Sequence, residues 1–167
     1  SKTFWFYCEI NPIQSFKWGT PPSFFGGNSI NNCSVINSYF GCLNTIDCYI
    51  DNVQISGFSW IYDTRFVSGS YFTNIKITNE SGINSFGMVN SSIDSLTLNN
   101  SSYIYEFDMN NSNMQYITID NDSYINGFTL DDDNSINHVS LNNNSRIENF
   151  SLYNGSEITN LNIDIES

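Results

Sequence analysis

The 167-residue sequence contains no alanine, three prolines and one histidine, and only 13% of its residues are charged. It is filled instead with Ile, Thr, Ser, Asn, Tyr and Phe, which, apart from Ser and Asn, favour strands over helices. No stretch approaches the ~18 consecutive apolar residues of a membrane-spanning helix. The composition therefore disfavours helical repeats and membrane spans. An apolar content of 40% is still enough for a continuous core.

Basic residues are also scarce, and the charge is unevenly placed. Five Lys and Arg stand against 17 Asp and Glu, which gives a net charge of −12. Residues 91–167 hold one basic residue, Arg146, against twelve acids. An acidic surface repels phosphate backbones, so we expect no nucleic-acid partner.

The four cysteines lie near the N-terminal end and show no Cys-x-x-Cys spacing. Because His138 is the only histidine, a zinc site is not expected, and neither is a cofactor. Cys33 and Cys48 fall on inward positions of the repeat described below, which predicts buried thiols. Disulfides remain open if the compartment is oxidising.

The sequence does contain a repeat of ten or eleven residues, which occurs thirteen times between Asn28 and Ser167. Its consensus is Ser-x-Ile-x-x-Phe-x-Leu, followed by an Asn- and Asp-rich connector. We number the Ile position zero, so that the other apolar positions are +3 and +5. Position −2 is Ser in ten copies. Position zero is occupied by Ile30, Phe40, Ile50, Ile61, Phe72, Ile83, Ile93, Ile104, Met114, Ile125, Ile136, Ile147 and Ile158.

This spacing predicts one bent strand and one corner per copy. Positions two apart share one face of a strand, whereas the gap of three between zero and +3 indicates a bend or bulge. The polar connectors predict corners, because Asn and Asp tolerate left-handed conformations. The Ser positions and the Asn-rich corners are expected to form hydrogen-bonded ladders between coils. Right-handed coiled coils and leucine-rich repeats fit the residue types and the repeat length poorly.

The predicted fold is thus all-β, an elongated β-solenoid or β-helix. One copy per coil could scarcely enclose the bulky inward residues, because strands in neighbouring coils are only about 4.8 Å apart. Two arrangements have enough girth: two copies per coil in one chain, or three intertwined chains in a homotrimer. No two-copy period is evident in the copy lengths, which mildly favours the trimer.

The chain divides at the start of the repeat. Residues 1–27 hold all three prolines and two of the three tryptophans, and we interpret them as an aromatic N-terminal cap or a junction to an upstream domain. Residues 28–167 form the solenoid. Because solenoids normally close their ends, we expect the parent protein or a partner chain to continue beyond Ser167.

The residues that could serve in catalysis or metal binding form no strong motif. Asp131, Asp132, Asp133 and Asn134 offer oxygen ligands to a hard cation, but without the spacing of a known calcium loop, and a solvated turn is favoured. His138 is expected to be an exposed bystander. Paired carboxylates would be needed for glycoside cleavage, and the outward acids considered for that role are Glu106, Asp108, Asp120, Asp122 and Glu148. No pair among them is distinguished, so no catalytic, metal or cofactor-binding residue is assigned.

Ice binding would require a regular file of outward threonines. Position +4 carries Thr97, Thr118 and Thr129 late in the chain, but Arg65 and Asp108 are among the residues that interrupt the file. The pattern therefore gives little support to an ice-binding surface.

The register of residues 28–167, with its Asn and Ser corners and its unfinished last copy, resembles the β-solenoid shafts of bacteriophage tail fibres, tailspikes and related viral fibres. The resemblance implies a homotrimeric, virion-associated rod that spaces or presents a host-recognition tip, with a host-surface glycan or protein as receptor. A secreted or cell-surface adhesin built as a single-chain β-helix is the first alternative. A carbohydrate-active β-helix enzyme is the second, and the absence of a distinguished acid pair argues against it.

Overall fold

A computed structural model of the chain describes residues 5–11, 23–25, 29–36, 39–67 and 69–164, with side chains for 33–36, 44–67 and 69–164. Every regular element within these ranges is a strand. The strands are β1 (Trp5–Asn11), β2 (Ser23–Phe25), β3 (Ser29–Ile36), β4 (Tyr39–Ile46), β5 (Tyr49–Ser56), β6 (Trp60–Val67), β7 (Tyr71–Thr78), β8 (Gly82–Val89), β9 (Ser92–Asn99), β10 (Tyr103–Asn110), β11 (Asn113–Ile119), β12 (Tyr124–Asp131), β13 (Ser135–Asn142), β14 (Arg146–Leu152) and β15 (Glu157–Asp164).

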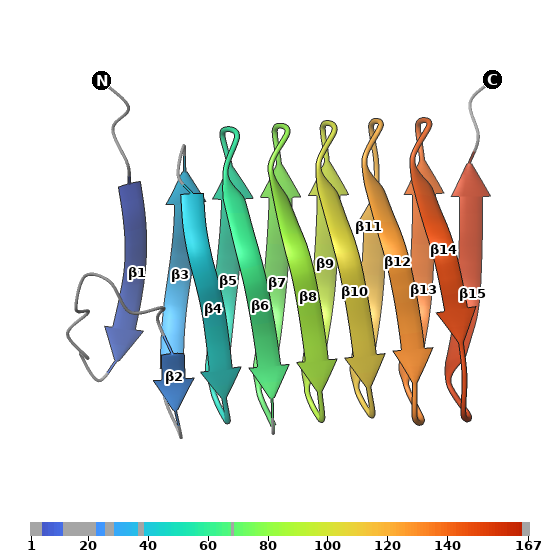
Figure 1. Cartoon of the computed structure of the whole chain (residues 1–167), viewed down its shortest axis with the longest axis horizontal. Helices are drawn as coiled ribbons and strands as arrows, with labels where there is room; N and C mark the ends of the chain where they lie inside the picture. Colours follow the sequence, from blue (N-terminus) through green and yellow to red (C-terminus); the bar gives the residue numbers. More distant parts are fainter. Residues whose placement is uncertain (1–4, 12–22, 26–28, 37–38, 68, 165–167) are drawn as a thin grey trace.

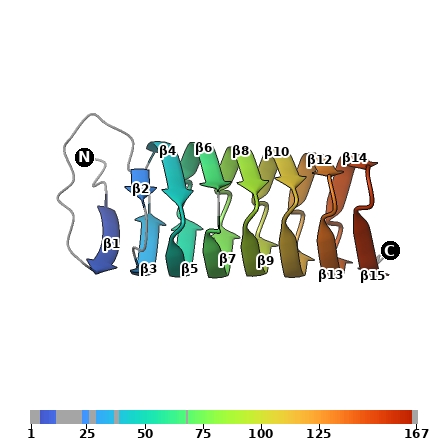
Figure 2. The ribbon, with the colours of Figure 1, turned by 90° about the horizontal axis from the view of Figure 1, so that it is seen from below.

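The strands form a β-solenoid, as predicted, and they are arranged in two sheets (Figure 1). Odd-numbered strands make one sheet, here called sheet A, and even-numbered strands make the other, sheet B. The two sheets lie face to face from β2 and β3 to β14 and β15 (Figure 2). Each of the thirteen copies contributes one strand from β3 to β15, and all pairings among these strands and with β2 are parallel.

Each coil consists of two copies from one chain. Ile104 on β10 pairs with Ile83 on β8 and with Ile125 on β12, so that its neighbours in the sheet lie 21 residues away. This is the first of the two arrangements that the sequence left open. The interior of each coil is filled by side chains of one chain, without a strand from a second chain.

The two sheets contribute different residues to the core, and this supplies the two-copy period that the copy lengths did not reveal. At position +3, sheet B places Phe86, Phe107 and Phe128 inward, whereas sheet A places aliphatic residues such as Leu96 and Ile117. These side chains are at most 1% exposed. From Ile75 to Leu161, aliphatic residues and phenylalanine therefore alternate at position +3, because consecutive copies belong to opposite sheets.

The predicted serine positions form a ladder along each of the two edges of the core, one before the strands of sheet B and one before those of sheet A. The backbone N–H of Ser102 donates to Oγ of Ser123 one coil further on, at 3.1 Å, and Ser59 donates in the same way to Ser81 at 3.0 Å. The hydroxyl of Ser102 donates back to the carbonyl of Asn99 at 2.7 Å. A buried polar group is tolerated when it is hydrogen-bonded, so these serines link adjacent coils at little cost in free energy.

The predicted amide ladders are found at the corners. The Asn111 side-chain amide donates to Oδ1 of Asn90 at 2.7 Å, and that of Asn121 donates to Oδ1 of Asn99 at 2.8 Å. Corner residues such as Asn90 (φ 49°) and Asn121 (φ 50°) adopt left-handed backbone conformations. Asn and Asp tolerate these conformations better than other non-glycine residues, which explains their abundance in the connectors.

The two ends of the solenoid differ. β1 extends sheet A at the N-terminal end, where it pairs antiparallel with β3. The aromatic side chains of residues 1–27 lie outside the described side chains. At the other end, residues at core positions of β14 and β15 are exposed to solvent. Phe150 is 45% exposed and Leu161 is 58% exposed, whereas Phe128 and Val139, their counterparts in the coil before, are 0% and 1% exposed. The expectation that the protein or a partner chain continues there stays a prediction.

Candidate functional site

The acidic residues expected at turns are dispersed along the corner ladders. Asp131 accepts a hydrogen bond from the Asn154 amide at 2.7 Å, and Asp132 accepts one from Asn110 at 2.9 Å. Asp120 and Asp122 accept in the same way from Asn143 and Asn144 on the next coil. Carboxylates at these corners therefore serve as acceptors that link adjacent coils.

The remaining candidate acids stand on the outer face of sheet B. Glu106 and Asp108 lie on β10, and Glu148 lies on β14, so that all of β12 separates Glu148 from the other two. Glu148 forms an ion pair with Arg146 at 2.5 Å. The topology does not bring Glu148 beside the acids of β10 as facing carboxylates across a cleft, which is the arrangement that glycoside cleavage needs.

Two other sequence candidates have simple structural roles. His138 is exposed, as predicted, and its ring stacks on Tyr116 with centroids 5.2 Å apart. Asn134 is 1% exposed and replaces Ser in the ladder, where its Oδ1 accepts from the Ser112 backbone N–H at 2.9 Å. Neither residue is part of a group of side chains that indicates catalysis or ligand binding.

The threonine file is divided by the two-sheet topology. Thr97 and Thr118 are direct neighbours on sheet A, followed by Ser140, whereas Thr129 belongs to sheet B. Lys76 precedes Thr97 in the sheet A row. The outward hydroxyls thus form short runs on separate faces, which weakens the ice-binding interpretation further.

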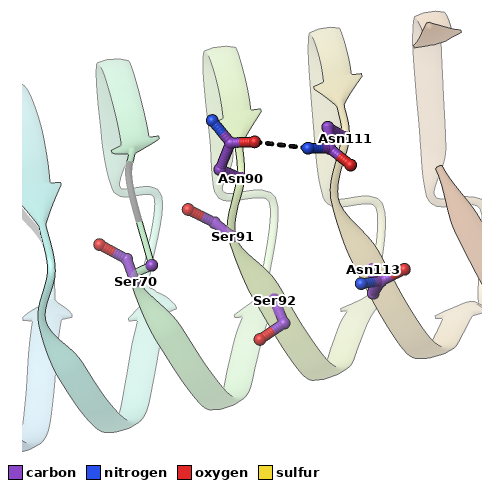
Figure 3. A pocket seen from close by; sticks show the side chains of 7 residues that line it. Ser70, Asn90, Ser91, Ser92, Asn111 and Asn113 are labelled. Atoms are coloured by element: carbon purple, nitrogen blue, oxygen red, sulfur yellow. Dashed lines mark hydrogen bonds between the residues drawn. The ribbon is translucent and has the colours of Figure 1, made fainter. Parts of the chain in front are cut away.

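An open polar depression of about 300 Å³ lies along one corner (Figure 3). Its lining includes Ser70, Asn90, Ser91 and Asn111, with the Asn111–Asn90 hydrogen bond across it. The seven lining residues are Gly, Ser and Asn, so the depression offers hydrogen-bonding groups without an acid, base or nucleophile of unusual reactivity. We regard it as a consequence of stacked corners.

The most distinctive surface is a row of aromatic rings on the outer face of sheet B, which we call the aromatic row. It consists of Trp60 and Tyr62 on β6, Tyr103 and Tyr105 on β10, and Tyr124 on β12. The rings of Trp60 and Tyr103 meet edge to face with centroids 4.6 Å apart, and Tyr103 stacks on Tyr124 at 5.6 Å. Such ring pairs stabilise beyond their buried area by about 0.5–1.5 kcal/mol each.

A glycine on β8, which has no side chain, makes the aromatic row continuous. Gly82 lies between Trp60 and Tyr103 in the sheet register. A Cβ atom at Gly82 would lie 2.3 Å from Cε2 of Tyr103, which shows that the tyrosine ring leans across β8. The glycine is therefore required by the close approach of that ring.

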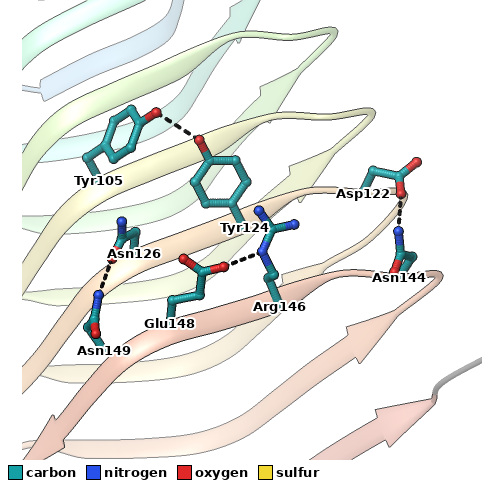
Figure 4. Close-up of polar contacts among 8 residues, drawn as sticks. All are labelled: Tyr105, Asp122, Tyr124, Asn126, Asn144, Arg146, Glu148 and Asn149. Atoms are coloured by element: carbon teal, nitrogen blue, oxygen red, sulfur yellow. Dashed lines mark hydrogen bonds and ion pairs between the residues drawn. The ribbon is translucent and has the colours of Figure 1, made fainter.

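The polar end of the row is shown in Figure 4. The hydroxyls of Tyr124 and Tyr105 are 2.9 Å apart and hydrogen-bonded, and Cζ of Arg146 lies 4.7 Å above the Tyr124 ring. Burial, followed by the hydrogen bond to Tyr105, raises the pKa of Tyr124 to about 12. Arg146 also binds Glu148, so the guanidinium is held between a ring and a carboxylate.

Tyr103 has an unsatisfied hydroxyl. The residue is 8% exposed, and its Oη is buried without a hydrogen-bond partner among the residues that the structure describes. Burial, followed by the nearby Tyr105 and Tyr124, raises the pKa of this phenol. A buried donor without a partner costs about 1–3 kcal/mol, so phenylalanine would serve better if Tyr103 had only a packing role.

Sequence reasoning missed this surface. Its residues lie one position before and one after position zero, and they become neighbours only when copies 21 residues apart are paired. The available signal was a pair of similar motifs, Trp-Ile-Tyr at Trp60–Tyr62 and Tyr-Ile-Tyr at Tyr103–Tyr105, which are four copies apart.

Comparison with known proteins gives no match. No family model matches the sequence, and no curated protein or solved structure matches it. Within the described ranges, no cluster of three or more His, Cys, Asp or Glu side chains could hold a metal ion. The same ranges contain no helix long and apolar enough to cross a membrane. The protein is thus defined by its architecture, a two-sheet β-solenoid of about six turns.

Proposed function

We propose that the chain is a structural, non-catalytic shaft segment of a phage or viral fibre or spike that takes part in host attachment. The observation that carries the proposal is the uninterrupted core, in which every described coil from Cys48 to Leu141 repeats the same buried positions. Thirteen strands at two per coil span about 30 Å along the solenoid axis, since adjacent strands lie about 4.8 Å apart. Such a rod holds its ends at a fixed distance.

The ladders support a mechanical role. Backbone pairing in two sheets, the serine ladder and the corner amides all run parallel to the axis, so that pulling on the ends loads many hydrogen bonds together. The net charge of −12 disfavours the binding of anionic polymers. A virion surface or an extracellular location suits this acidic, Asn- and Ser-rich exterior.

We expect three chains to associate, and the mass of the protein in solution tests this. A species near three times 19.0 kDa by light scattering supports the homotrimeric fibre. A stable monomer contradicts it and favours the second candidate, a secreted or cell-surface adhesin. Closure of each coil within one chain is the observation that favours that candidate.

A catalytic function is tested separately. We expect no new reducing ends when the protein is incubated with host or bacterial polysaccharides. Cleavage that is abolished by Glu106→Gln or by Asp108→Asn would overturn the non-catalytic proposal, because these acids stand beside the aromatic row on β10.

A further inference from the structure

The aromatic row has exposed ring faces as well as internal contacts. Tyr62 is 58% exposed, and Trp60, Tyr105 and Tyr124 are partly exposed. Rings that served only to pack against one another would be expected to bury their faces. These rings instead form a platform that follows the solenoid axis from β6 to β12.

Polar groups alternate with the rings. At position +1 of sheet B, the outward residues in strand order are Tyr62, Asn84, Tyr105, Asn126 and Glu148. Aromatic faces are electron-rich and attract weakly positive C–H groups, whereas amides and carboxylates bind hydroxyls. A surface that repeats both kinds of group suits a ligand that has an apolar C–H face and a rim of hydroxyls, which describes a pyranose ring.

The charge on the outer face of sheet B indicates which class of saccharide could bind there. Its exposed charged residues are three acids, Glu106, Asp108 and Glu148, and two bases, Arg65 and Arg146. Arg146 is already engaged by Glu148 and Tyr124. With a net negative face on a chain of charge −12, an anionic polysaccharide or a phosphate would be repelled.

We propose that the outer face of sheet B from β6 to β12 binds a neutral oligosaccharide that lies along the solenoid axis across the aromatic row. This assignment rests on the proposed attachment role and names the class of receptor. The three interstrand steps from β6 to β12 cover about 14 Å, a length suited to a short run of pyranose units. Trp60 and Tyr62 on β6 stack on sugar faces, and Asn84 and Asn126 bind hydroxyls further along the row.

The buried hydroxyl of Tyr103 provides independent support. It has no hydrogen-bond partner within the described part of the chain, although its residue is more than nine-tenths buried in the middle of the row. A ligand hydroxyl supplies the missing partner. The pairing requires a side-chain movement, and the partly exposed rings that contact Tyr103 are Trp60, Tyr105 and Tyr124.

The test measures binding of the whole chain to an array of neutral oligosaccharides, including chitotriose, cellotriose and maltotriose, with trigalacturonate as the anionic probe. We expect a neutral probe to bind and trigalacturonate not to bind. Trp60→Ala should weaken the affinity for the bound probe by about tenfold or more. Tyr116→Ala is the matched control, because Tyr116 is 52% exposed on the outer face of sheet A.

Tyr103→Phe separates binding from packing. It removes the unpaired hydroxyl and keeps the ring, so we expect an unchanged or higher melting temperature together with weaker binding of the same probe. Failure of every neutral probe to bind, preferential binding of trigalacturonate, or equal affinity of Trp60→Ala and wild type would each overturn the assignment.

The two proposals fail in different ways. A monomer that binds neutral oligosaccharide through Trp60 removes the homotrimeric fibre and keeps this surface. A trimer that binds no neutral oligosaccharide keeps the fibre and removes this surface.

Discussion

The rings of Phe107 and Phe128 stack inside sheet B with centroids 4.7 Å apart and an angle of 17° between their planes. The two residues are 21 positions apart and occupy the same position of copies that are not consecutive. Their contact shows directly that a coil contains two copies. Phe86 and Phe107 continue the column at 4.6 Å, so one sheet supplies an aromatic column along the core.

Substitution of Ile125 by Asp should destabilise the protein by several kcal/mol. Ile125 is 0% exposed, and the new carboxylate would be buried without a partner. Asn126→Asp is the matched control: it introduces the same residue at the next, outward position and should cost little. Chemical denaturation followed by circular dichroism measures both. Similar losses for the two variants would mean that the register is misplaced.

Gly82→Ala should displace the Tyr103 ring, because the added Cβ would lie 2.3 Å from it. We expect a loss of about 1–3 kcal/mol from this overpacking and a change in near-ultraviolet circular dichroism as the Trp60–Tyr103 contact opens. Gly87→Ala on the same strand is the control, since its nearest atoms lie at 3.6 and 3.7 Å. An unchanged spectrum for Gly82→Ala would contradict the close approach.

Asn134→Ala should cost about 1–3 kcal/mol, because it leaves the buried N–H of Ser112 without its acceptor. The Asn134 amide group also donates to the carbonyls of Met109 at 3.0 Å and Asp131 at 2.7 Å. Asn134→Ser restores the residue found at this position in most copies and should recover part of the loss. Thermal melting compares the three proteins, and a serine variant no better than alanine would count against the ladder.

The protein should lose stability as the pH rises from 10 to 12. A hydrogen bond to Asp94, followed by burial, raises the pKa of Tyr71 to about 12, and burial raises that of Tyr124 to about 12. An unfolded tyrosine ionises near 10. Since the folded state holds these protons more tightly, the two tyrosines contribute their full stabilisation of the folded state below pH 10. This stabilisation is lost as the pH passes through 12.

Absorbance of tyrosinate follows this titration in the folded protein. Asp94→Asn should lower the pKa of Tyr71, because the hydrogen bond to Asp94 is the largest cause of its shift. Tyr124 should titrate as before, since its pKa is set on the opposite sheet. If Asp94→Asn left every late-titrating tyrosine unchanged, the contact would not exist in solution.

The register could be predicted from the sequence because it follows from side-chain chemistry alone. Ile and Phe recur at buried positions, Ser recurs where a small hydrogen-bonding group fits, and Asn recurs at left-handed corners. The same reasoning placed Cys33 and Cys48 in the interior, where they are 3% and 2% exposed.

The pairing of copies was harder to predict, because copy length carries no information about which copy is the neighbour. The alternation at position +3, where Phe107 and Phe128 are separated by Ile117, did carry that information. The aromatic row followed from the pairing and could not be assembled without it. The position of the Tyr103 ring over Gly82 depends on side-chain rotation, which a repeat pattern does not specify.

Cross-linking of engineered cysteines tests the central claim, that two copies of one chain form each coil. Thr97 and Thr118 are direct partners on β9 and β11, at a spacing that permits a disulfide. Thr118 and Thr129 are one copy apart and lie on opposite sheets. The account predicts an intramolecular disulfide in Thr97→Cys/Thr118→Cys and none in Thr118→Cys/Thr129→Cys, read by mass spectrometry of the cross-linked peptides. The reverse result, or a Thr97→Cys/Thr118→Cys bond that joins separate chains, would contradict it.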